Sequence, residues 1–121
     1  MPEAVVAITG ASGARYGVRL LDALCEAGWS SHLIITREGA INLDLECGIT
    51  PAELASNSLI TLENNDNLAA RSASGSARFD AYIICPTSGT TIGKIAAGIS
   101  DNLATRSALV AMKERRKLIL V

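Results

Sequence analysis

The segment from Ile8 to Gly17 places a run of small residues between an apolar run and a helical pattern. Val5–Ile8 before it has the character of a buried strand, and leucines at helical spacing follow it. A strand that turns directly into a helix leaves free backbone N–H groups at the positive end of the helix dipole. Because Gly10 and Gly13 have no side chains, the backbone there can approach an anion closely. The segment fits both a phosphate-binding turn and an ordinary tight turn, and taken alone it does not decide between them.

Apolar runs and helical patterns alternate along the whole chain. Strands are predicted at residues 4–9, 31–36, 59–62, 80–86 and 117–121, and helices at 14–27, 37–46, from 51, at 92–98 and at 103–116. Hydrophobic residues make up 49% of the chain but aromatic residues only 3%, so the core is aliphatic. Such strands, joined through helices, are typical of a parallel sheet buried on both faces, with right-handed crossovers. The sequence therefore predicts an α/β fold with a doubly wound parallel sheet, in one domain over residues 1–121.

The last predicted strand, Lys117–Val121, ends on apolar residues. A buried parallel strand normally leads into a loop at the edge where open α/β sheets bind ligands. We therefore expect the sheet to be truncated after its fourth or fifth strand, with the C-terminal part of the domain missing.

Charge and cysteine content narrow the function classes. The net charge is −1, which gives no broad electrostatic case for binding nucleic acid or an anionic membrane. The one charged run, Lys113–Lys117, fits a helix C-terminus, where cations interact favourably with the dipole. The three cysteines lack metal-ligand spacing, which favours reduced thiols. With no signal-peptide pattern and no membrane-spanning run, we expect a cytoplasmic protein.

A second strand-to-helix turn, Thr87–Thr91, is also rich in small and hydroxyl residues. Because the carboxyl ends of parallel strands meet at one edge of a sheet, we expect this turn to converge with the turn at Gly10–Gly13. Two converging anion-binding turns suit a mononucleotide, which has a phosphate and a planar ring. The glycine spacing does not match the dinucleotide fingerprint and there is no P-loop lysine, so NAD and ATP are disfavoured.

Two other features carry weaker signals. The only histidine, His32, falls inside a predicted strand, which argues against a Ser–His hydrolase and favours a structural role. The segment 58–79 contains a polar turn, Asn64–Asn67, and a small, flexible run, Ser72–Ser76. A surface loop and a ligand-binding loop both fit this segment, and we favour the surface loop.

Three ordered blocks of residues resemble the UbiX family of flavin prenyltransferases, long described as aromatic acid decarboxylases. The first block is Thr9-Gly10-Ala11-Ser12-Gly13-Ala14 with Tyr16-Gly17 and Arg19-Leu20-Leu21. The second block is Ile84-Cys85-Pro86 with Ser88 and Thr91. The third block is Asp101-Asn102-Leu103 with Arg106, Ala108, Val110-Ala111, Lys113-Glu114-Arg115-Arg116 and Leu118. Together they cover most of the chain with the family's order and spacing.

The resemblance implies a Rossmann-like or flavodoxin-like homo-oligomer, trimer-based and in some cases dodecameric, that binds FMN. It implies transfer of a dimethylallyl group from dimethylallyl phosphate to reduced FMN. The product, prenylated FMN, would serve a UbiD-type decarboxylase as its cofactor. This chain would correspond to the N-terminal portion of such an enzyme.

The family match also implies site residues. FMN contacts fall on Gly10, Ala11, Ser12, Thr36, Ser88, Gly89, Thr90, Thr91 and Arg106. The implied catalytic residues are Ser12, Glu46 and Lys113. Ser12 would orient the flavin edge, Glu46 would stabilise positive charge or move a proton, and Lys113 would hold the substrate phosphate. No metal is implied. Taken without the family match, Glu46, Arg106 and Lys113 are ordinary solvated helix charges.

The chain also departs from the family pattern. Thr36 stands where the family often has Ser, and Thr87 where it frequently has Cys, which are mild changes. The family's later Pro-Arg-Glu segment, tyrosine and basic residue have no counterpart before Val121. The alternative function is therefore a non-catalytic FMN-binding or electron-transfer module. A cysteine-decarboxylase flavoprotein is less favoured, because such enzymes rely on a catalytic histidine and the only histidine here, His32, falls inside a predicted strand.

Overall fold

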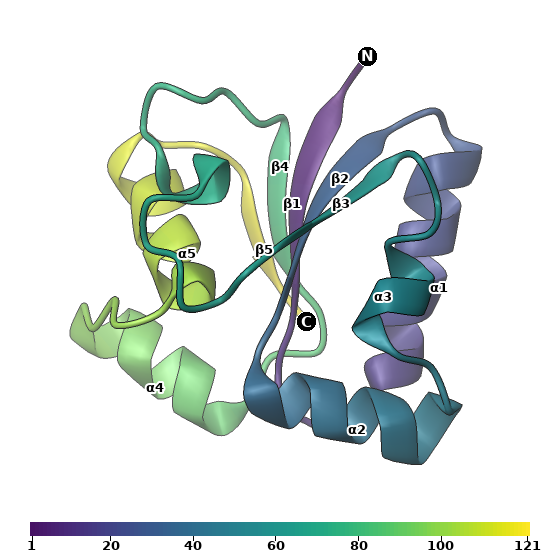
Figure 1. The fold of residues 1–121 in the computed structure, drawn as a ribbon. Coiled ribbons are helices and arrows are strands. Elements are labelled where there is room, and N and C mark those ends of the chain that lie inside the picture. Colours follow the sequence, from purple (N-terminus) through teal and green to yellow (C-terminus); the bar gives the residue numbers. More distant parts are fainter.

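The computed structural model describes all of residues 1–121. Its centre is a five-stranded parallel sheet with the order β3-β2-β1-β4-β5 (Figure 1). The strands are β1 Glu3–Ile8, β2 Ser30–Ile35, β3 Ile60–Glu63, β4 Ala81–Ile84 and β5 Leu118–Leu120. The helices are α1 Ala14–Glu26, α2 Arg37–Cys47, α3 Pro51–Leu54, α4 Gly89–Ala97, α5 Leu103–Lys113 and the short 3₁₀ helix η1 Arg71–Ala73. The predicted α/β fold with a doubly wound parallel sheet is confirmed.

The central strand β1 is buried on both sides, as its unbroken apolar sequence predicts. It pairs with β2 on one side and β4 on the other, so that Val6 lies beside Leu33 and Ile83. Every residue from Ala4 to Ile8 is at most 1% exposed. A strand in this position has no solvent-facing side, which is why its hydrophobicity does not alternate.

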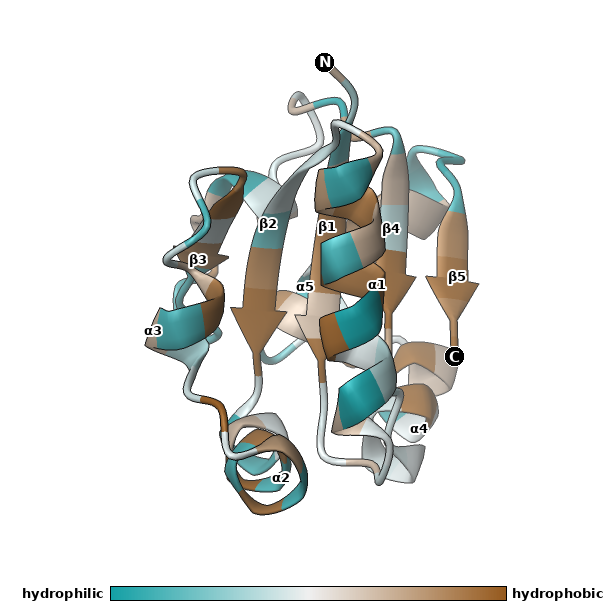
Figure 2. Ribbon diagram, turned by 90° about the vertical axis from the view of Figure 1, so that its right-hand side faces the viewer, coloured by the Kyte–Doolittle hydropathy of each residue, from teal (hydrophilic) through white to brown (hydrophobic).

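The side chains of β1 alternate between two cores, one on each face of the sheet. Val6 and Ile8 pack with Leu21 of α1, and the short helix α3 lies on the same face. Val5 and Ala7 pack against α5, whose contact residues are mostly alanine, together with η1. Figure 1 shows α1 and α3 on one side of the sheet and α5 on the other, and Figure 2 shows hydrophobic residues at the arrowhead ends of β2, β4 and β5.

Two helices, α2 and α4, lie at the carboxyl edge of the sheet, below its strands in Figure 1. The chain leaves β1 toward β2 and later returns to β4 on the other side of β1. This reversal of strand order opens a crevice at the carboxyl ends of β1 and β4, where open α/β sheets bind ligands. The fold therefore places a candidate site between α2 and α4.

Some element boundaries differ from those expected. The helix predicted from Ile92 begins three residues earlier, at Gly89, because Ser88 caps its first turn. The helix predicted to reach Arg116 ends at Lys113, and Arg115 has a positive φ of 55° just beyond it. No helix of the chain combines the length and the apolar character that crossing a membrane requires.

The small-residue run Ser72–Ser76 is not the flexible loop that its composition suggested. Ser72 is fully buried, its hydroxyl donates to the carboxylate of Glu63, and its N–H donates to the same group. Arg116 donates to the carbonyls of Gly75 and Ala77 and to the hydroxyl of Tyr82. These contacts hold the segment between β3 and β4 in place. They also correct the prediction that Arg116 serves only as a cation that interacts favourably with a helix dipole.

His32 has the structural role predicted for it. Its Nδ1 lies 2.8 Å from Glu63, its Nε2 lies 3.3 Å from Glu3, and Arg71 bonds to Glu3 at 2.7 Å. Burial opposes ionisation of Glu63, but the hydrogen bonds from His32 and Ser72 outweigh it and hold the pKa of Glu63 below its ordinary value. The ring of Phe79 packs edge-on against His32. This cluster joins β1, β2 and β3 to η1.

Candidate functional site

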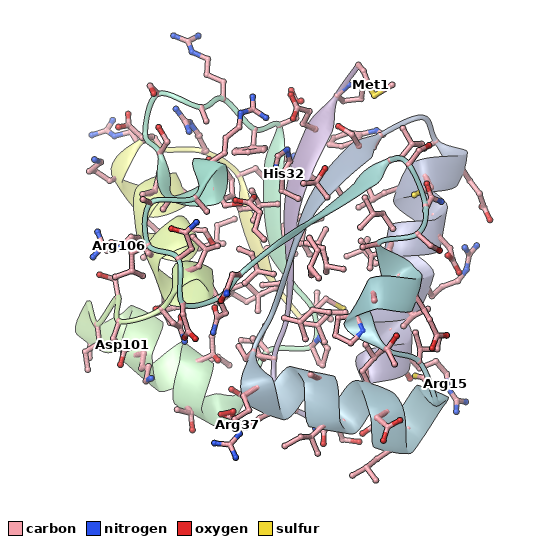
Figure 3. All side chains as sticks on the ribbon, in the orientation of Figure 1. Met1, Arg15, His32, Arg37, Asp101 and Arg106 are labelled. Carbon is pink, nitrogen blue, oxygen red and sulfur yellow. The ribbon has the colours of Figure 1, made fainter.

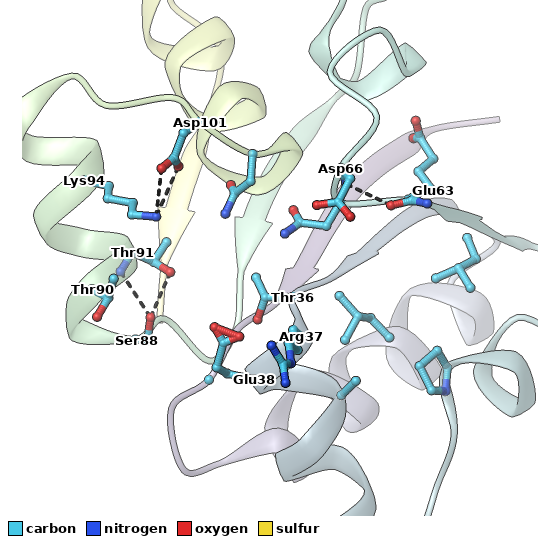
Figure 4. Close-up of a pocket in the computed structure, with 18 residues that line it drawn as sticks. Thr36, Arg37, Glu38, Glu63, Asp66, Ser88, Thr90, Thr91, Lys94 and Asp101 are labelled. Carbon is cyan, nitrogen blue, oxygen red and sulfur yellow. Dashed lines mark hydrogen bonds and ion pairs between the residues drawn. The ribbon is translucent and has the colours of Figure 1, made fainter.

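A cavity of about 780 Å³ opens at the carboxyl edge of the sheet (Figure 4). This volume lies within the range of small-molecule and cofactor sites. Only three of its 18 lining residues are hydrophobic. Most of the lining residues come from the ends of β2 and β3, from the first turns of α2 and α4, and from the start of α5. So polar a lining suits a ligand with many hydrogen-bonding groups.

Two helices begin at the wall of this cavity with N-cap hydroxyls. The side chain of Thr36 accepts from the N–H of Gly39 at 3.0 Å, and that of Ser88 accepts from the N–H of Thr91 at 3.1 Å. The hydroxyls of Ser88 and Thr91 lie 2.8 Å apart. Both strand-to-helix transitions therefore use the preferred N-cap residue types.

The first two N–H groups of α2 and of α4 make no hydrogen bond within the chain; they belong to residues 37, 38, 89 and 90. Such groups at a helix start carry partial positive charge and bind anions. Both helix starts border one cavity, so each offers it donors of the kind that bind a phosphate group.

The other two long helices have their first turns occupied by the protein itself. The carboxylate of Glu46 accepts from the N–H groups of Gly13 and Ala14, at 3.0 and 2.9 Å, at the start of α1. At the start of α5, Leu103 donates to the carbonyl of Asn65 at 2.8 Å, and Ala104 donates to its side-chain oxygen at 3.0 Å. The N-termini of α2 and α4 are therefore distinguished from those of α1 and α5 by their free donors.

This geometry corrects part of the anion-binding prediction for Gly10–Gly13. The N–H of Gly13 already donates to the carboxylate of Glu46, so the start of α1 is not free to bind a phosphate. The hydrogen bonds from Gly13 and Ala14 hold the pKa of Glu46 below its ordinary value, and Ser12 and Arg15 act in the same direction. Within the predicted turn, the N–H groups of residues 10–12 remain without acceptors.

The two strand-to-helix turns converge as predicted, and Thr9 joins them. Its hydroxyl donates to the carbonyl of Pro86 at 2.6 Å and accepts from the N–H of Ser88 at 2.8 Å. Its own N–H also donates to Pro86, at 3.2 Å. Thr9 is completely buried, so these bonds are shielded from water. The turn after β1 is thereby held in register with the turn after β4.

The structure places the predicted site residues in separate groups. Gly10, Thr36, Ser88, Thr90 and Thr91 line the large cavity, and Gly89 lies between two of them on α4. Ser12 and Glu46 instead line a second cavity of about 380 Å³, together with Gly13, Arg15 and Tyr16. Ala11 lies between the two groups in sequence, and its carbonyl accepts from Asn42.

Arg106 and Lys113 lie on α5, and neither lines a cavity. The Nε of Arg106 (Figure 3) is buried and has no hydrogen-bond partner, which leaves one polar atom available for a ligand or a second chain. The side chain of Lys113 is 68% exposed and lies 3.8 Å from Glu114. Because α5 starts at the cavity and runs toward the opposite edge of the sheet, a single chain does not bring Lys113 to the site.

Several cavity residues were not anticipated from the sequence. Asn64, Asn65 and Asp66 line the cavity, so the polar turn after β3 is part of the site rather than only a surface loop. The signal available was its position directly after a strand, at the ligand-binding edge of the sheet. Arg37 and Lys94 are the cations of the lining, and no pattern in the sequence distinguished them from other surface charges.

The Flavoprotein family model matches residues 2–121. The chain belongs to the Flavoprotein family. This assignment agrees with the polar cavity at the carboxyl edge and with its phosphate-compatible donors.

Curated relatives narrow the similarity within that family. The chain is 41% identical over 117 residues to a probable UbiX-like flavin prenyltransferase of Bacillus subtilis, covering 97% of the chain and 57% of the relative. It is 44% identical over 117 residues to the flavin prenyltransferase UbiX of Thermoplasma acidophilum, covering 97% of the chain and 63% of that protein. The resemblance found in the three sequence blocks is confirmed. The chain spans about three fifths of the length of these relatives.

Solved structures give the same result for the fold. The crystal structure of AnUbiX in complex with FMN and dimethylallyl pyrophosphate superposes with a TM-score of 0.94 at 36% identity, covering 99% of this chain and 63% of the other. A dodecameric FMN-dependent UbiX-like decarboxylase from Escherichia coli gives a TM-score of 0.93 at 38% identity, covering 98% of this chain and 65% of that chain. The flavodoxin-like architecture is thus shared with proteins that bind FMN.

Proposed function

We propose that this chain is the FMN-binding portion of a flavin prenyltransferase. The observation that carries the proposal is the pair of free helix N-termini, of α2 and α4, which face one polar cavity. FMN differs from riboflavin by a phosphate, and free N–H groups at helix starts are suited to such an anion. The similarity to flavin prenyltransferases supplies the reaction class.

The residues around the cavity have the chemistry that FMN requires. The free N–H groups of Gly89 and Thr90, with the hydroxyls of Ser88 and Thr91, would hold the phosphate, and Thr36 lines the same cavity. Gly10 would let the ring approach the backbone after β1, where Ala11 and Ser12 keep free N–H groups. Arg106, with its unpartnered Nε, is the remaining proposed contact.

Reduced flavin, when bound, supplies the nucleophilic ring that accepts the dimethylallyl group of dimethylallyl phosphate as inorganic phosphate leaves. Breaking the carbon–oxygen bond places positive charge on the allyl group and negative charge on the phosphate. Glu46 is held ionised by Gly13 and Ala14, which suits it to stabilise the cationic allyl group. The same hydrogen bonds make it a poor proton donor near neutral pH. Ser12, beside it, would orient the edge of the flavin.

The role proposed for Lys113, to hold the substrate phosphate, requires a second copy of the chain. Lys113 lies outside both cavities of its own chain, so it would act in the site of a neighbouring copy. Tyr16 and Leu45 are 71% and 76% exposed, which supports further assembly. We propose a trimer-based oligomer, in some cases a dodecamer, that works in the cytoplasm and delivers prenylated FMN to a UbiD-type decarboxylase.

The test combines binding with transfer. The chain is titrated with FMN and with riboflavin, then incubated without oxygen with reduced FMN and dimethylallyl phosphate, and the flavin is examined by mass spectrometry. We expect FMN to bind more tightly than riboflavin and the flavin to gain the mass of one dimethylallyl unit. Glu46→Gln should abolish the mass gain while FMN still binds.

The alternative function, a non-catalytic FMN-binding or electron-transfer module, predicts a different pattern. Ser12 and Glu46 line a second cavity that is separate from the large one in a single chain. This separation of the proposed catalytic residues from the proposed FMN site favours the alternative. Tight FMN binding with no change in flavin mass, in both the unchanged chain and the Glu46→Gln variant, would support it over prenyl transfer.

A further inference from the structure

One ion pair forms part of the cavity wall and is unused by the proposed reaction. The ammonium group of Lys94 lies 3.1 Å from both carboxylate oxygens of Asp101 (Figure 4). Lys94 lies on α4 three residues after Thr91, Ser88 is the N-cap of the same helix, and all three line the cavity. The side chain of Lys94 is 30% exposed and that of Asp101 is 56% exposed.

The cavity lining has more carboxylates than cations, so each cation matters for binding an anion. Carboxylates from Glu38, Glu63, Asp66 and Asp101 line it, against only two cations, Arg37 and Lys94. Arg37 is exposed and forms no ion pair within the chain, whereas the charge of Lys94 is balanced by Asp101. An anion that enters a site with excess negative charge is repelled unless a cation turns toward it.

We propose that Lys94 is a phosphate-recognition residue that exchanges Asp101 for the phosphate of the bound flavin. In the free protein, Asp101 partners the ammonium group and keeps it at the cavity wall. When phosphate binds at the start of α4, Lys94 pairs with it, and the more exposed Asp101 returns to solvent. This inference rests on the proposed function and adds to it a residue that distinguishes FMN from riboflavin.

The flexible stem of lysine suits this exchange. An ammonium group donates in several directions, so it can leave one acceptor for another without moving the helix that carries it. A charge-assisted hydrogen bond to phosphate is stronger than a neutral one. The exchange therefore requires no rearrangement of α4, whose first turn is already fixed by Ser88.

The test measures FMN and riboflavin affinities by flavin fluorescence for four variants at low ionic strength. Lys94→Met should weaken FMN binding by about tenfold and leave riboflavin binding within about twofold. Asp101→Asn should strengthen FMN binding, because it removes the competing acceptor, and this gain should disappear in the Lys94→Met/Asp101→Asn double variant. Lys117→Met is the matched control, since it removes one exposed positive charge outside both cavities.

The outcomes separate the two proposals. If the unchanged chain binds neither flavin, the proposed function is overturned. If it binds FMN but Lys94→Met weakens FMN and riboflavin by the same factor, or no more than Lys117→Met does, only the role of Lys94 is overturned. An effect of Asp101→Asn that persists without Lys94 would contradict the exchange.

Discussion

The hydroxyl of Thr9 accepts a hydrogen bond from the N–H of Ser88 across 2.8 Å, although 79 residues separate them in the sequence. Through this bond the turn after β1 fixes the start of α4, whose N-cap residue, Ser88, lines the cavity. The hydroxyl also donates to Pro86, so one buried side chain serves two backbone groups of the second turn. The geometry of the candidate phosphate site therefore depends on a residue that does not line it.

Thr9→Val tests this dependence. The change keeps the shape of the side chain but leaves the part-buried N–H of Ser88 without its acceptor, and the Pro86 carbonyl keeps only its bond from the N–H of residue 9, at a cost of about 1–3 kcal/mol. We expect lower stability in urea and weaker FMN binding. Thr61→Val on β3 is the control, because Thr61 is exposed and its hydroxyl makes no hydrogen bond. Equal stability of the two variants would contradict the role of Thr9.

Gly17 lets α1 approach the sheet. A Cβ there would meet the carbonyl oxygen of Cys85 at 2.5 Å and a side-chain carbon of Ile8 at 3.0 Å. Gly17→Ala should therefore destabilise the chain by about 1–3 kcal/mol. Gly93→Ala, in the open interior of α4, should stabilise it by about 0.5–1 kcal/mol. Calorimetric melting of both variants checks the opposite signs.

The Glu46 carboxylate gives the stability a defined pH dependence. Its pKa in the folded chain lies below the ordinary 4.5, so its ionised form stabilises the start of α1. That contribution is complete above about pH 4.5 and disappears as the pH falls through the folded pKa. Glu46→Gln should melt at a lower temperature than the unchanged chain at pH 7. This difference in melting temperature should shrink as the pH falls through the folded pKa of Glu46. Asp22→Asn, on an exposed part of α1, should show no such difference.

The buried hydroxyl of Ser72 supports the segment between β3 and β4. Ser72→Ala removes its bond to Glu63 and should cost about 1–2 kcal/mol in urea unfolding. It should also raise the pKa of Glu63, which that hydroxyl helps to lower, and carboxyl NMR titration measures the shift. Ser58→Ala is the exposed control. An unchanged titration of Glu63 would show that its other contacts, from His32 and the N–H of Ser72, set its ionisation without the hydroxyl.

Much of the fold follows from local sequence patterns. The continuous apolar runs identified β1, β2 and β4, and the hydroxyl caps at Thr36 and Ser88 fall where strands give way to helices. The convergence of the two turns follows from parallel topology alone. The resemblance to the UbiX family added Thr36, which lines the same cavity as Gly10 and Thr91 of the two turns.

What the sequence could not predict depends on contacts between distant segments. Nothing in the residues near Glu46 indicates that its carboxylate binds the start of α1, some 30 positions earlier. The burial of Ser72 likewise depends on Glu63, and composition alone suggested a flexible loop. The pairing of Lys94 with Asp101 is also invisible in the sequence, because exposed charges seven residues apart have no required relationship.

The two hydrogen bonds from the first turn of α5 to Asn65 link local unfolding of two regions. Residues 64–66 form cavity wall, so a ligand that rests on them also stabilises the turn that Asn65 holds. The start of α5 and the segment after β3 should then open together, as one cooperative unit. Occupancy of the cavity would slow amide hydrogen exchange at Leu103 and Ala104, although neither residue lines the cavity.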